Sequence, residues 1–204
     1  QLIERRSVDQ IYPQKTATIG SPVLSVAHLS HPTEFNDISF ALNKGEILGF
    51  YGLVGSGRSE VMQALFGITT PSAGTVTLQD TNVDFNSPAD AIDAGIVYVP
   101  EERGKQGVVV DLPIFQNVSL PSLGNTSRNG FLQLAEEFTL VRDYATRLDL
   151  RAASLSQHAG TLSGGNQQKV VVTKWLATQP KVIILDEPTK GIDIGSKAAV
   201  HEFM

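Results

Sequence analysis

The sequence predicts an α/β fold with a parallel sheet flanked by helices, and three observations support it. Short β-like runs alternate with helix-like runs from Pro22 onward. The run "VIIL" at 182–185 is apolar throughout, which suits a strand buried on both faces of a sheet. A glycine-rich loop at 52–59 lies between an expected strand and an expected helix. The chain of 204 residues is long enough for one substantial domain or two small lobes.

The expected strands are short, and most lie in the first hundred residues. They are "VLSVAHL" (23–29), "DISFAL" (37–42), "EILGFYGL" (46–53), "GTVTLQD" (74–80), "GIVYVP" (95–100) and, near the end, "KVIILD" (181–186). Helices are expected at Arg58–Phe66, which Gly67 would end, and at Ala89–Asp93 after Pro88.

The pattern changes between Glu101 and about Gly160. The stretches "ERGKQG" and "SLGNTSRNG" are typical of loops, and a helical run follows at Glu136–Leu150. Its apolar positions recur near i, i+4 spacing, at Leu140, Tyr144 and Leu148. The sequence therefore predicts a helical insertion within the α/β core.

Composition excludes several classes of protein. The net charge of −5 argues against a nucleic-acid binder, which would carry a basic stripe. The absence of cysteine excludes disulfides and thiolate metal sites, and the four histidines show no ligand spacing. No apolar run approaches the roughly 18 residues of a membrane span, and the start "QLIERRSVDQIYPQ" is too polar for a secretory signal.

The glycine-rich loop nearly matches a phosphate-binding loop. In "FYGLVGSGRSEVM", Gly52, Gly57 and Ser59 keep the spacing of G-x-x-x-x-G-K-[ST], but Arg58 replaces the lysine. Backbone N–H groups and the helix N-terminus would hold phosphates, and the Ser59 hydroxyl would bind Mg²⁺. Because arginine is a planar fork that cannot thread the loop as lysine does, an altered nucleotide pose is expected, and a purely structural glycine turn stays open.

Two further motifs follow at a distance. The strand "VIILDEP" ends in Asp186, which would orient Mg²⁺, and Glu187, which would polarise an attacking water. An acidic turn at a strand end is the plainer alternative. About twenty residues upstream, "TLSGGNQQK" precedes a helical run at 170–177, and Ser163 is a natural N-cap whose following glycines expose N–H groups. A capping turn without further function is the alternative there.

Together these motifs resemble the nucleotide-binding domain of ATP-binding cassette (ABC) proteins, from Pro22 to Met204. More narrowly, "GEILGFYGLVGSGRSE", "YVPEERGKQGVV" and "LSGGNQQK" are similar to the second cassette of bacterial double-cassette sugar importers of the ribose, galactose and xylose type, in which arginine replaces the lysine. The resemblance implies a P-loop NTPase (RecA-like) core with an antiparallel β edge and a helical subdomain, in a C-terminally truncated fragment. It implies an inter-cassette linker at 1–20 and a cassette at 21–204, with core 21–100 and 168–204 and helical signature subdomain 101–167.

The resemblance also implies roles for individual residues. The catalytic acid would be Glu187, and metal ligands would be Ser59, Asp186 and Glu101, which stands where the family usually has glutamine. The nucleotide-binding set would be Gly52, Gly55, Ser56, Gly57, Arg58, Ser59 and Glu60, with Phe35 as an adenine-stacking candidate whose alternative is core packing. The signature would be Leu162, Ser163, Gly164, Gly165, Asn166 and Gln167, and the segment that communicates across the dimer Gly191, Ile192 and Asp193.

The function implied is an ATPase with ATP and Mg²⁺ as cofactors, which drives monosaccharide import from the cytoplasmic face of the bacterial inner membrane. Its partners would be the first cassette of the same polypeptide, the transmembrane permease subunits and, indirectly, a periplasmic sugar-binding protein, with no nucleic acid. This chain's signature would complete the partner's site, whereas its own site would be impaired and the fragment alone inactive. Two alternatives stay open, a regulatory nucleotide-binding or dimerisation module and a soluble cassette ATPase of DNA repair or translation. The sequence does not name the sugar.

Overall fold

The computed structural model describes residues 17–192, 197–198, 200–201 and 204. Two compact units make up the chain. The sheet unit comprises residues 17–98 and 179–186, and the helical unit comprises 99–178 and the described residues from 187 onward. Among the described residues, every helix is too short or too polar to cross a membrane.

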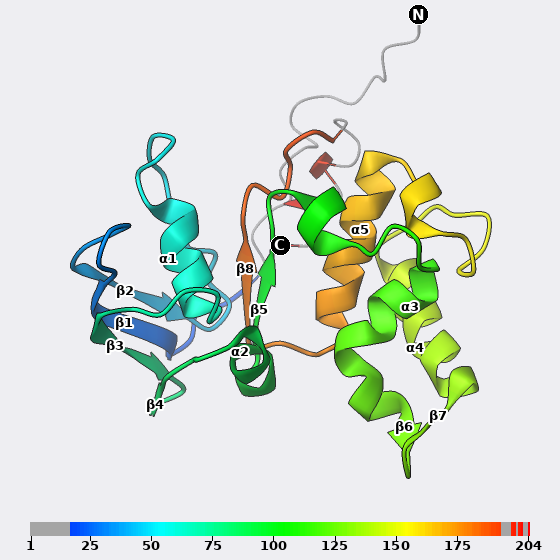
Figure 1. Cartoon of the computed structure of the whole chain (residues 1–204), viewed down its shortest axis with the longest axis horizontal. Helices are drawn as coiled ribbons and strands as arrows, with labels where there is room; N and C mark the ends of the chain where they lie inside the picture. The colour runs from blue at the N-terminus through cyan, green and yellow to red at the C-terminus, as the bar shows by residue number, and fades with distance from the viewer. Residues whose placement is uncertain (1–16, 193–196, 199, 202–203) are drawn as a thin grey trace, which may run out of the picture. The chain divides into compact units, whose positions relative to one another are not determined.

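An antiparallel sheet forms most of the sheet unit (Figure 1). Strand β1 (Pro22–Ser30) pairs with β2 (Ile38–Asn43) on one side and β3 (Ala73–Leu78) on the other, and β3 continues into β4 (Thr81–Val83). The strand order is therefore β2-β1-β3-β4. Alternate side chains of β1 are buried, at Leu24 and Val26, as expected for a strand with one face on a core.

The rest of the sheet unit alternates helices and strands, which confirms the predicted order. Helix α1 (Arg58–Leu65) is followed by its C-cap Phe66 and then Gly67, and α2 (Pro88–Ala94) begins after Ser87, whose hydroxyl accepts the Asp90 N–H. Strand β5 (Ile96–Val99) is buried along its whole length and neighbours β8 (Val182–Leu185), with both arrows running the same way in Figure 1. This pair is the parallel element that the apolar runs predicted.

The expected strand at 46–53 is not a strand in the structure, so that prediction is wrong here. In the described part of the chain, β5 and β8 pair directly with each other, and the segment 46–53 belongs to none of the three sheets. A strand is held by the hydrogen bonds of its neighbours, so a segment without a ladder stays irregular. Its apolar side chains are accordingly exposed, with Tyr51 99% and Leu53 83% accessible.

Three helices pack together in the helical unit, as predicted for an insertion. They are α3 (Ile114–Ser119), α4 (Leu134–Arg147) and α5 (Gly164–Leu176), and the side chains between them include Ile114, Val118, Val141, Val170 and Val171. The buried Asn117 has its amide satisfied, because Nδ2 donates to the Val109 carbonyl at 2.9 Å and Oδ1 accepts the Val109 N–H at 2.7 Å. This pair of bonds ties the chain before α3 to the helix itself.

The two stretches predicted as loops contain regular structure. A π-helical turn, η2, spans Arg103–Gly107, a 3₁₀ segment, η3, spans Leu120–Thr126, and a second 3₁₀ turn, η4, spans Ala159–Thr161. Strands β6 (Ser127–Arg128) and β7 (Phe131–Leu132) form a hairpin around Asn129–Gly130, both with positive φ. Asn-Gly favours such a two-residue turn, so the signal was present in "RNGF".

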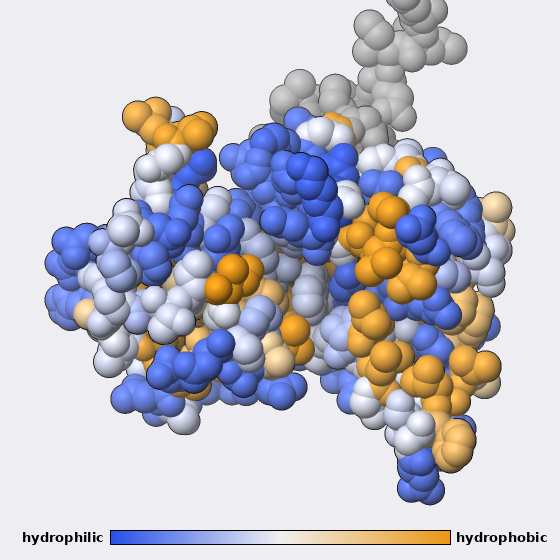
Figure 2. Space-filling view, in the orientation of Figure 1, coloured by the Kyte–Doolittle hydropathy of each residue, from blue (hydrophilic) through white to orange (hydrophobic). Residues whose placement is uncertain are grey.

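Apolar side chains remain exposed on the helical unit. Figure 2 shows hydrophobic surface gathered around the hairpin and α4. The side chains concerned are Leu120, Phe131, Leu132, Leu134 and Phe138, with Phe131 75% accessible. Exposed apolar patches of this kind are typical of contact surfaces. The functional division of the chain at 20, 100 and 167 stays a prediction, and residues 1–16 of the expected linker lie outside the described residues.

Gly74 provides a test of the close approach between β1 and β3. An ideal Cβ at this position, where φ is +101°, would lie 2.5 Å from the Leu29 Cα and 2.6 Å from the His28 carbonyl oxygen. We expect Gly74→Ala to lower the free energy of unfolding by about 3–4 kcal/mol, because strain and backbone overlap add. Gly95→Ala is the matched control, since its φ is +99° and its Cβ would meet only the flexible Lys181 side chain.

Urea denaturation followed by far-ultraviolet circular dichroism measures both variants. Gly95→Ala should lower the free energy of unfolding by about 1–2 kcal/mol, which is the cost of placing alanine at a positive φ without a backbone clash. Equal losses in the two variants would contradict the close approach of the strands.

Lys174 makes stability depend on pH. Its Nζ donates to the Gly107 carbonyl at 2.5 Å, and burial lowers its pKa to about 8 from 10.5. Between pH 8 and 10.5 the unfolded chain binds more protons at Lys174 than the folded chain does. The free energy of unfolding should therefore rise with pH, by up to about 3 kcal/mol across this pH range. The fluorescence of Trp175, the only tryptophan, reports unfolding of this helix.

Lys174→Met should abolish that rise, whereas Lys105→Met, at an exposed position, should keep it. A slope between pH 8 and 10 that is the same in both variants would exclude Lys174 as its source.

Candidate functional site

The glycine loop ends in a helix that begins without a side-chain cap. Gly55 and Gly57 have φ of 81° and 86°, and Gly57 is the N-cap of α1. The first N–H groups of a helix have no partner within it, and here no side chain accepts them at the cap position. The loop therefore presents backbone donors and the positive end of a helix dipole to an anion.

Close contacts explain two of the loop's glycines. An ideal Cβ at Gly57 would lie 2.9 Å from the Glu34 carbonyl oxygen, and one at Gly52 would lie 2.6 Å from the Ser56 Oγ. Ser56 in turn donates its N–H to the Leu53 carbonyl at 3.1 Å, which closes the turn. Glycine is thus required for the loop to fold back on itself and on the chain near Glu34.

The first turn of α1 carries Arg58, Ser59 and Glu60, all half-buried. The Glu60 carboxylate is favourable at the positive end of the helix, while the Ser59 hydroxyl is an oxygen donor of the kind that Mg²⁺ prefers. Arg58 keeps a positive charge at this position. The loop and the start of its helix, residues 52–59, therefore combine backbone donors, one cation and two hydroxyls, those of Ser56 and Ser59.

Phe35 lies beside the glycine loop but packs inward. It is only 9% exposed, its ring centroid lies 5.8 Å from that of His31, and an ideal Cβ at Gly57 would be 3.5 Å from its Cβ. Its carbonyl accepts the His31 N–H at 2.9 Å. These contacts favour the packing alternative, and a stacking role on adenine stays a prediction.

Asp186, at the end of β8, is held by a residue that the motifs did not indicate. The Tyr98 hydroxyl donates to Asp186 Oδ2 at 2.7 Å, and the Tyr98 ring stacks on Phe66 at 5.6 Å between centroids. Phe66 directly follows α1. A chain of contacts thus joins the glycine-loop helix, β5 and the carboxylate. The sequence signal was slight, a single tyrosine in the buried strand "IVYV".

Glu187 begins the second part of the helical unit and is exposed. Its φ is 46°, a left-handed conformation that costs a non-glycine residue roughly 1 kcal/mol or more. Its carbonyl accepts the Lys190 N–H at 3.0 Å, so a tight turn follows the acid. Strained backbone of this kind is common at functional sites, and the catalytic role of Glu187 stays a prediction.

The signature segment caps α5 as predicted. Ser163 Oγ accepts the Asn166 N–H at 3.4 Å and the Asn166 side-chain amide at 3.0 Å. Asn166 also accepts the Arg151 N–H at 3.0 Å, and Gln167 Nε2 donates to the Ala159 carbonyl at 3.3 Å. Leu162 and Gly165 are buried. The segment is therefore fixed from both sides at the start of the helix.

Glu101 forms an ion pair with Lys190, next to the dimer segment. The Glu101 carboxylate hydrogen-bonds the ammonium and so raises the pKa of Lys190 above its ordinary value. The neighbouring Glu102 pairs with Lys105 at 2.9 Å, which lowers the pKa of Glu102. Sequence reasoning named Glu101 but missed Lys190, and Asp193 lies outside the described residues.

Two oxygen donors of the sheet unit suit Mg²⁺ that is bound together with a nucleotide. Among the described residues, acidic and histidine side chains nowhere gather in threes as a metal site. The sheet unit offers the Ser59 hydroxyl and the Asp186 carboxylate, both hard oxygen donors. Magnesium bound with a nucleotide takes one or two protein ligands and several water or phosphate oxygens. This donor set therefore suits Mg²⁺ with a nucleotide.

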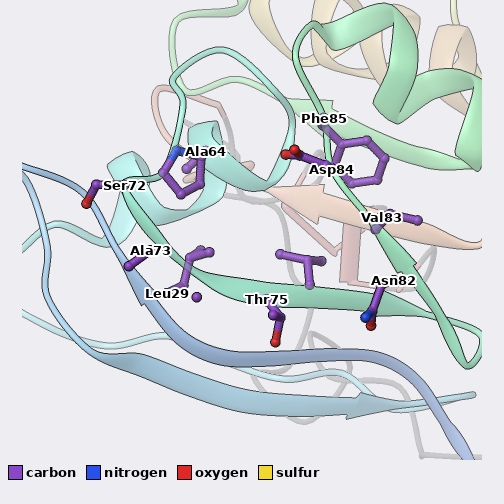
Figure 3. Close-up of a pocket in the computed structure, with 12 residues that line it drawn as sticks. Leu29, Ala64, Ser72, Ala73, Thr75, Asn82, Val83, Asp84 and Phe85 are labelled. Carbon is purple, nitrogen blue, oxygen red and sulfur yellow. The ribbon is translucent and has the colours of Figure 1, made fainter.

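A pocket of about 310 Å³ in the sheet unit lies away from these residues (Figure 3). Its lining includes Leu29, Ala64, Asn82, Asp84 and Phe85, from β1, α1 and the chain after β3. None of the glycine-loop residues 52–59 lines it. The pocket is therefore separate from the proposed phosphate site.

Comparisons with known proteins agree with the motifs. A family profile described as "ABC transporter" matches residues 35–190. The "Ribose import ATP-binding protein RbsA 1" of Rhizobium meliloti (strain 1021) is 70% identical over 98% of this chain, and RbsA of Jannaschia sp. (strain CCS1) is 67% identical over 100%. The chain spans 40% of the length of each of these relatives.

Solved structures confirm the fold class. The chain superimposes on the "ATP-binding cassette MJ0796 bound to ADP and Pi" with a TM-score of 0.73 and 19% identity, covering 87% of this chain and 79% of that one. For cbiO1 from Clostridium perfringens the TM-score is 0.71 at 24% identity, covering 90% and 74%. The predicted α/β core with an antiparallel β edge and a helical insertion is therefore confirmed.

Tyr98→Phe tests the contact at the end of β8. The variant keeps the ring on Phe66 but removes the hydrogen bond to Asp186, which should lower the free energy of unfolding by about 1–3 kcal/mol, as for a bond to a charged group. Urea unfolding measures the loss. Tyr51→Phe, where the side chain is 99% exposed, should be neutral.

The double variant with Asp186→Ala should lose less than the sum of the two single losses, because both substitutions remove the same bond. Strict additivity would show that the bond contributes nothing.

Proposed function

Because the chain belongs to the ABC transporter family, we propose that it is an ATP-binding domain that couples ATP binding and hydrolysis to import of a monosaccharide into a bacterium. The names of relatives at 64–70% identity support ribose as the sugar. The domain acts at the cytoplasmic face of the inner membrane, with membrane-embedded permease subunits and, indirectly, a periplasmic binding protein.

The observation that carries the nucleotide part of the proposal is the uncapped start of α1 behind the glycine loop. Phosphate oxygens take the place of the missing cap, as anions do at helix N-termini. Ser59 and Asp186 would hold Mg²⁺, and the metal would supply positive charge against the phosphates. Glu187 orients and polarises the attacking water, and the protein otherwise contributes by positioning.

We infer that the domain is the second cassette of a double-cassette polypeptide. Its relatives are more than twice as long as this chain, which leaves room for another cassette. In such a pair, the nucleotide lies between the glycine loop of one cassette and the signature of the other. The segment 162–167 then completes the partner's site, and the linker at 1–20 joins the two.

The domain's own site hydrolyses slowly or not at all. Arg58 occupies the lysine position, and Glu101, which replaces the usual glutamine, is engaged with Lys190. A guanidinium fork cannot reach along the loop as an ammonium does. The 204-residue chain by itself therefore binds nucleotide weakly and has negligible turnover.

The second candidate is a regulatory nucleotide-binding module that never hydrolyses ATP. The same two substitutions favour it, at Arg58 and Glu101. The two candidates predict different effects of Arg58→Lys. In a regulatory module this change would leave transport unchanged, whereas a slow catalytic site would gain activity from the lysine.

The partners of the helical unit are the permease subunits. Its exposed apolar side chains, Phe131, Leu132 and Leu134 among them, offer a surface for protein contact. The segment 101–107 passes closure on ATP binding to the membrane subunits. Sugar specificity then belongs to the binding protein and the permease.

Single-turnover ATP hydrolysis in the reconstituted transporter tests the asymmetry. Glu187→Gln should slow hydrolysis less than about threefold, while the same change in the partner cassette should slow it by about 10²-fold or more, the scale of losing a catalytic acid or base. Glu136→Gln, which removes only an exposed ion pair with Arg128, is the control.

Arrest of hydrolysis by Glu187→Gln would instead make the arginine loop a working variant. Full activity after Gly165→Asp, at a buried signature glycine, would refute the signature role.

A further inference from the structure

Arg103 connects two functional segments of the helical unit. Its Nη1 donates to the Lys190 carbonyl at 2.7 Å, and its Nη2 donates to the Gly191 carbonyl at 3.0 Å. The Nε atom is buried and has no hydrogen-bond partner among the described residues. One guanidinium thus holds two successive carbonyls at the start of the dimer segment.

The same guanidinium lies against the signature. An ideal Cβ on Gly164 would be 2.7 Å from Arg103 Nη2 and 3.4 Å from the Gly191 carbonyl oxygen. Gly164 is the first residue of α5, where its backbone is not in the left-handed region. A Cβ at 164 would therefore displace the flexible Arg103 guanidinium, while the backbone of Gly164 itself is unstrained.

The other end of η2 is fixed on α5. An ideal Cβ on Gly107 would be 2.7 Å from the Val171 Cγ2, and Lys174 Nζ donates to the Gly107 carbonyl. The Glu101–Lys190 ion pair, one residue before η2's cap, adds a second link to the segment at 190. The turn 103–107 is thus in contact with the signature helix at both ends.

We propose that Arg103 is a positioning residue that clamps Lys190, Gly191 at the start of the dimer segment, and signature Gly164 onto η2, so that the three move together. The proposal rests on the proposed function, since it assigns the route by which a shift of the segment 101–107 reaches the composite nucleotide site. Arginine suits the task because two separate nitrogens of its rigid planar fork reach the two carbonyls, whereas lysine offers a single nitrogen on a flexible stem.

Hydrogen exchange of the full-length protein measures the clamp directly, without any ATP chemistry. The reporter is the Lys190 amide, which donates to the Glu187 carbonyl at 3.0 Å. Arg103→Gln should speed its exchange by about tenfold or more, because local opening sets exchange where tertiary contacts are lost, while α3 and α4 stay protected. Arg142→Gln, on the exposed face of α4, is the matched control.

Unchanged exchange at Lys190 in Arg103→Gln would overturn the clamp. Faster exchange throughout α3–α5 would also overturn it, since the residue would then serve the stability of the whole unit.

A double-mutant cycle links the clamp to turnover in the reconstituted transporter. Arg103→Gln and Gly164→Ala should each lower single-turnover hydrolysis by about tenfold or more, as small misplacements do, with the affinity for ATP changed less than about threefold. The double variant should be no slower than the slower single variant, because both displace the same guanidinium. Arg103→Lys should restore part of the rate by keeping one bond.

Additive losses in that cycle would overturn the contact with Gly164 as the route. Ser163→Ala is the reference, since it removes the cap of α5 without touching Arg103 and should be additive with Arg103→Gln. A transporter without measurable ATP hydrolysis would refute the proposed function, while the exchange experiment would still decide the clamp.

Discussion

The organisation of the chain depends on how the first backbone N–H groups of two helices are satisfied. Helix α5 is capped by Ser163, whose hydroxyl accepts the Asn166 N–H, so its first turn is partly satisfied within the chain. Helix α1 has Gly57 at its N-cap, which has no side chain to accept these N–H groups. Because no side chain caps them, the first N–H groups of α1 are available to an anion from outside. The N-terminus of α1 is therefore suited to bind an anion, whereas the N-terminus of α5 is already held by its own cap.

The sequence predicted elements that rest on local signals. Helix α2 was predicted from Pro88, α5 from the Ser163 cap, and β5 and β8 from their apolar runs. The strand at 46–53 was mispredicted because a strand exists only with a neighbour, which a local pattern does not supply. The hairpin at Asn129–Gly130 was missed for another reason, since its turn signal was present but the surrounding polar residues suggested a loop.

Within the candidate site too, the residues found from the sequence are those with local signals, and the residues missed have partners far along the chain. Motif spacing located the glycine loop, the signature and the two acids, because those residues act through backbone donors and carboxylates that are adjacent in sequence. It could not locate Tyr98, Arg103 or Lys190, whose partners lie 87 to 89 residues away. Such pairs arise only when the chain after β8 meets the chain around β5. Contacts of this range were beyond sequence reasoning.

The relative strength of two links decides what holds the segment at 190–191. The Glu101–Lys190 pair is exposed, with 59% of the lysine side chain accessible, so water and salt screen it. The bonds of half-buried Arg103 go to backbone carbonyls from a charged donor, and such bonds stabilise by roughly 1.5–3 kcal/mol each. The guanidinium is therefore the dominant link. Glu101 is consequently the more easily released of the two, and its carboxylate can change partners while Lys190–Gly191 stays in place.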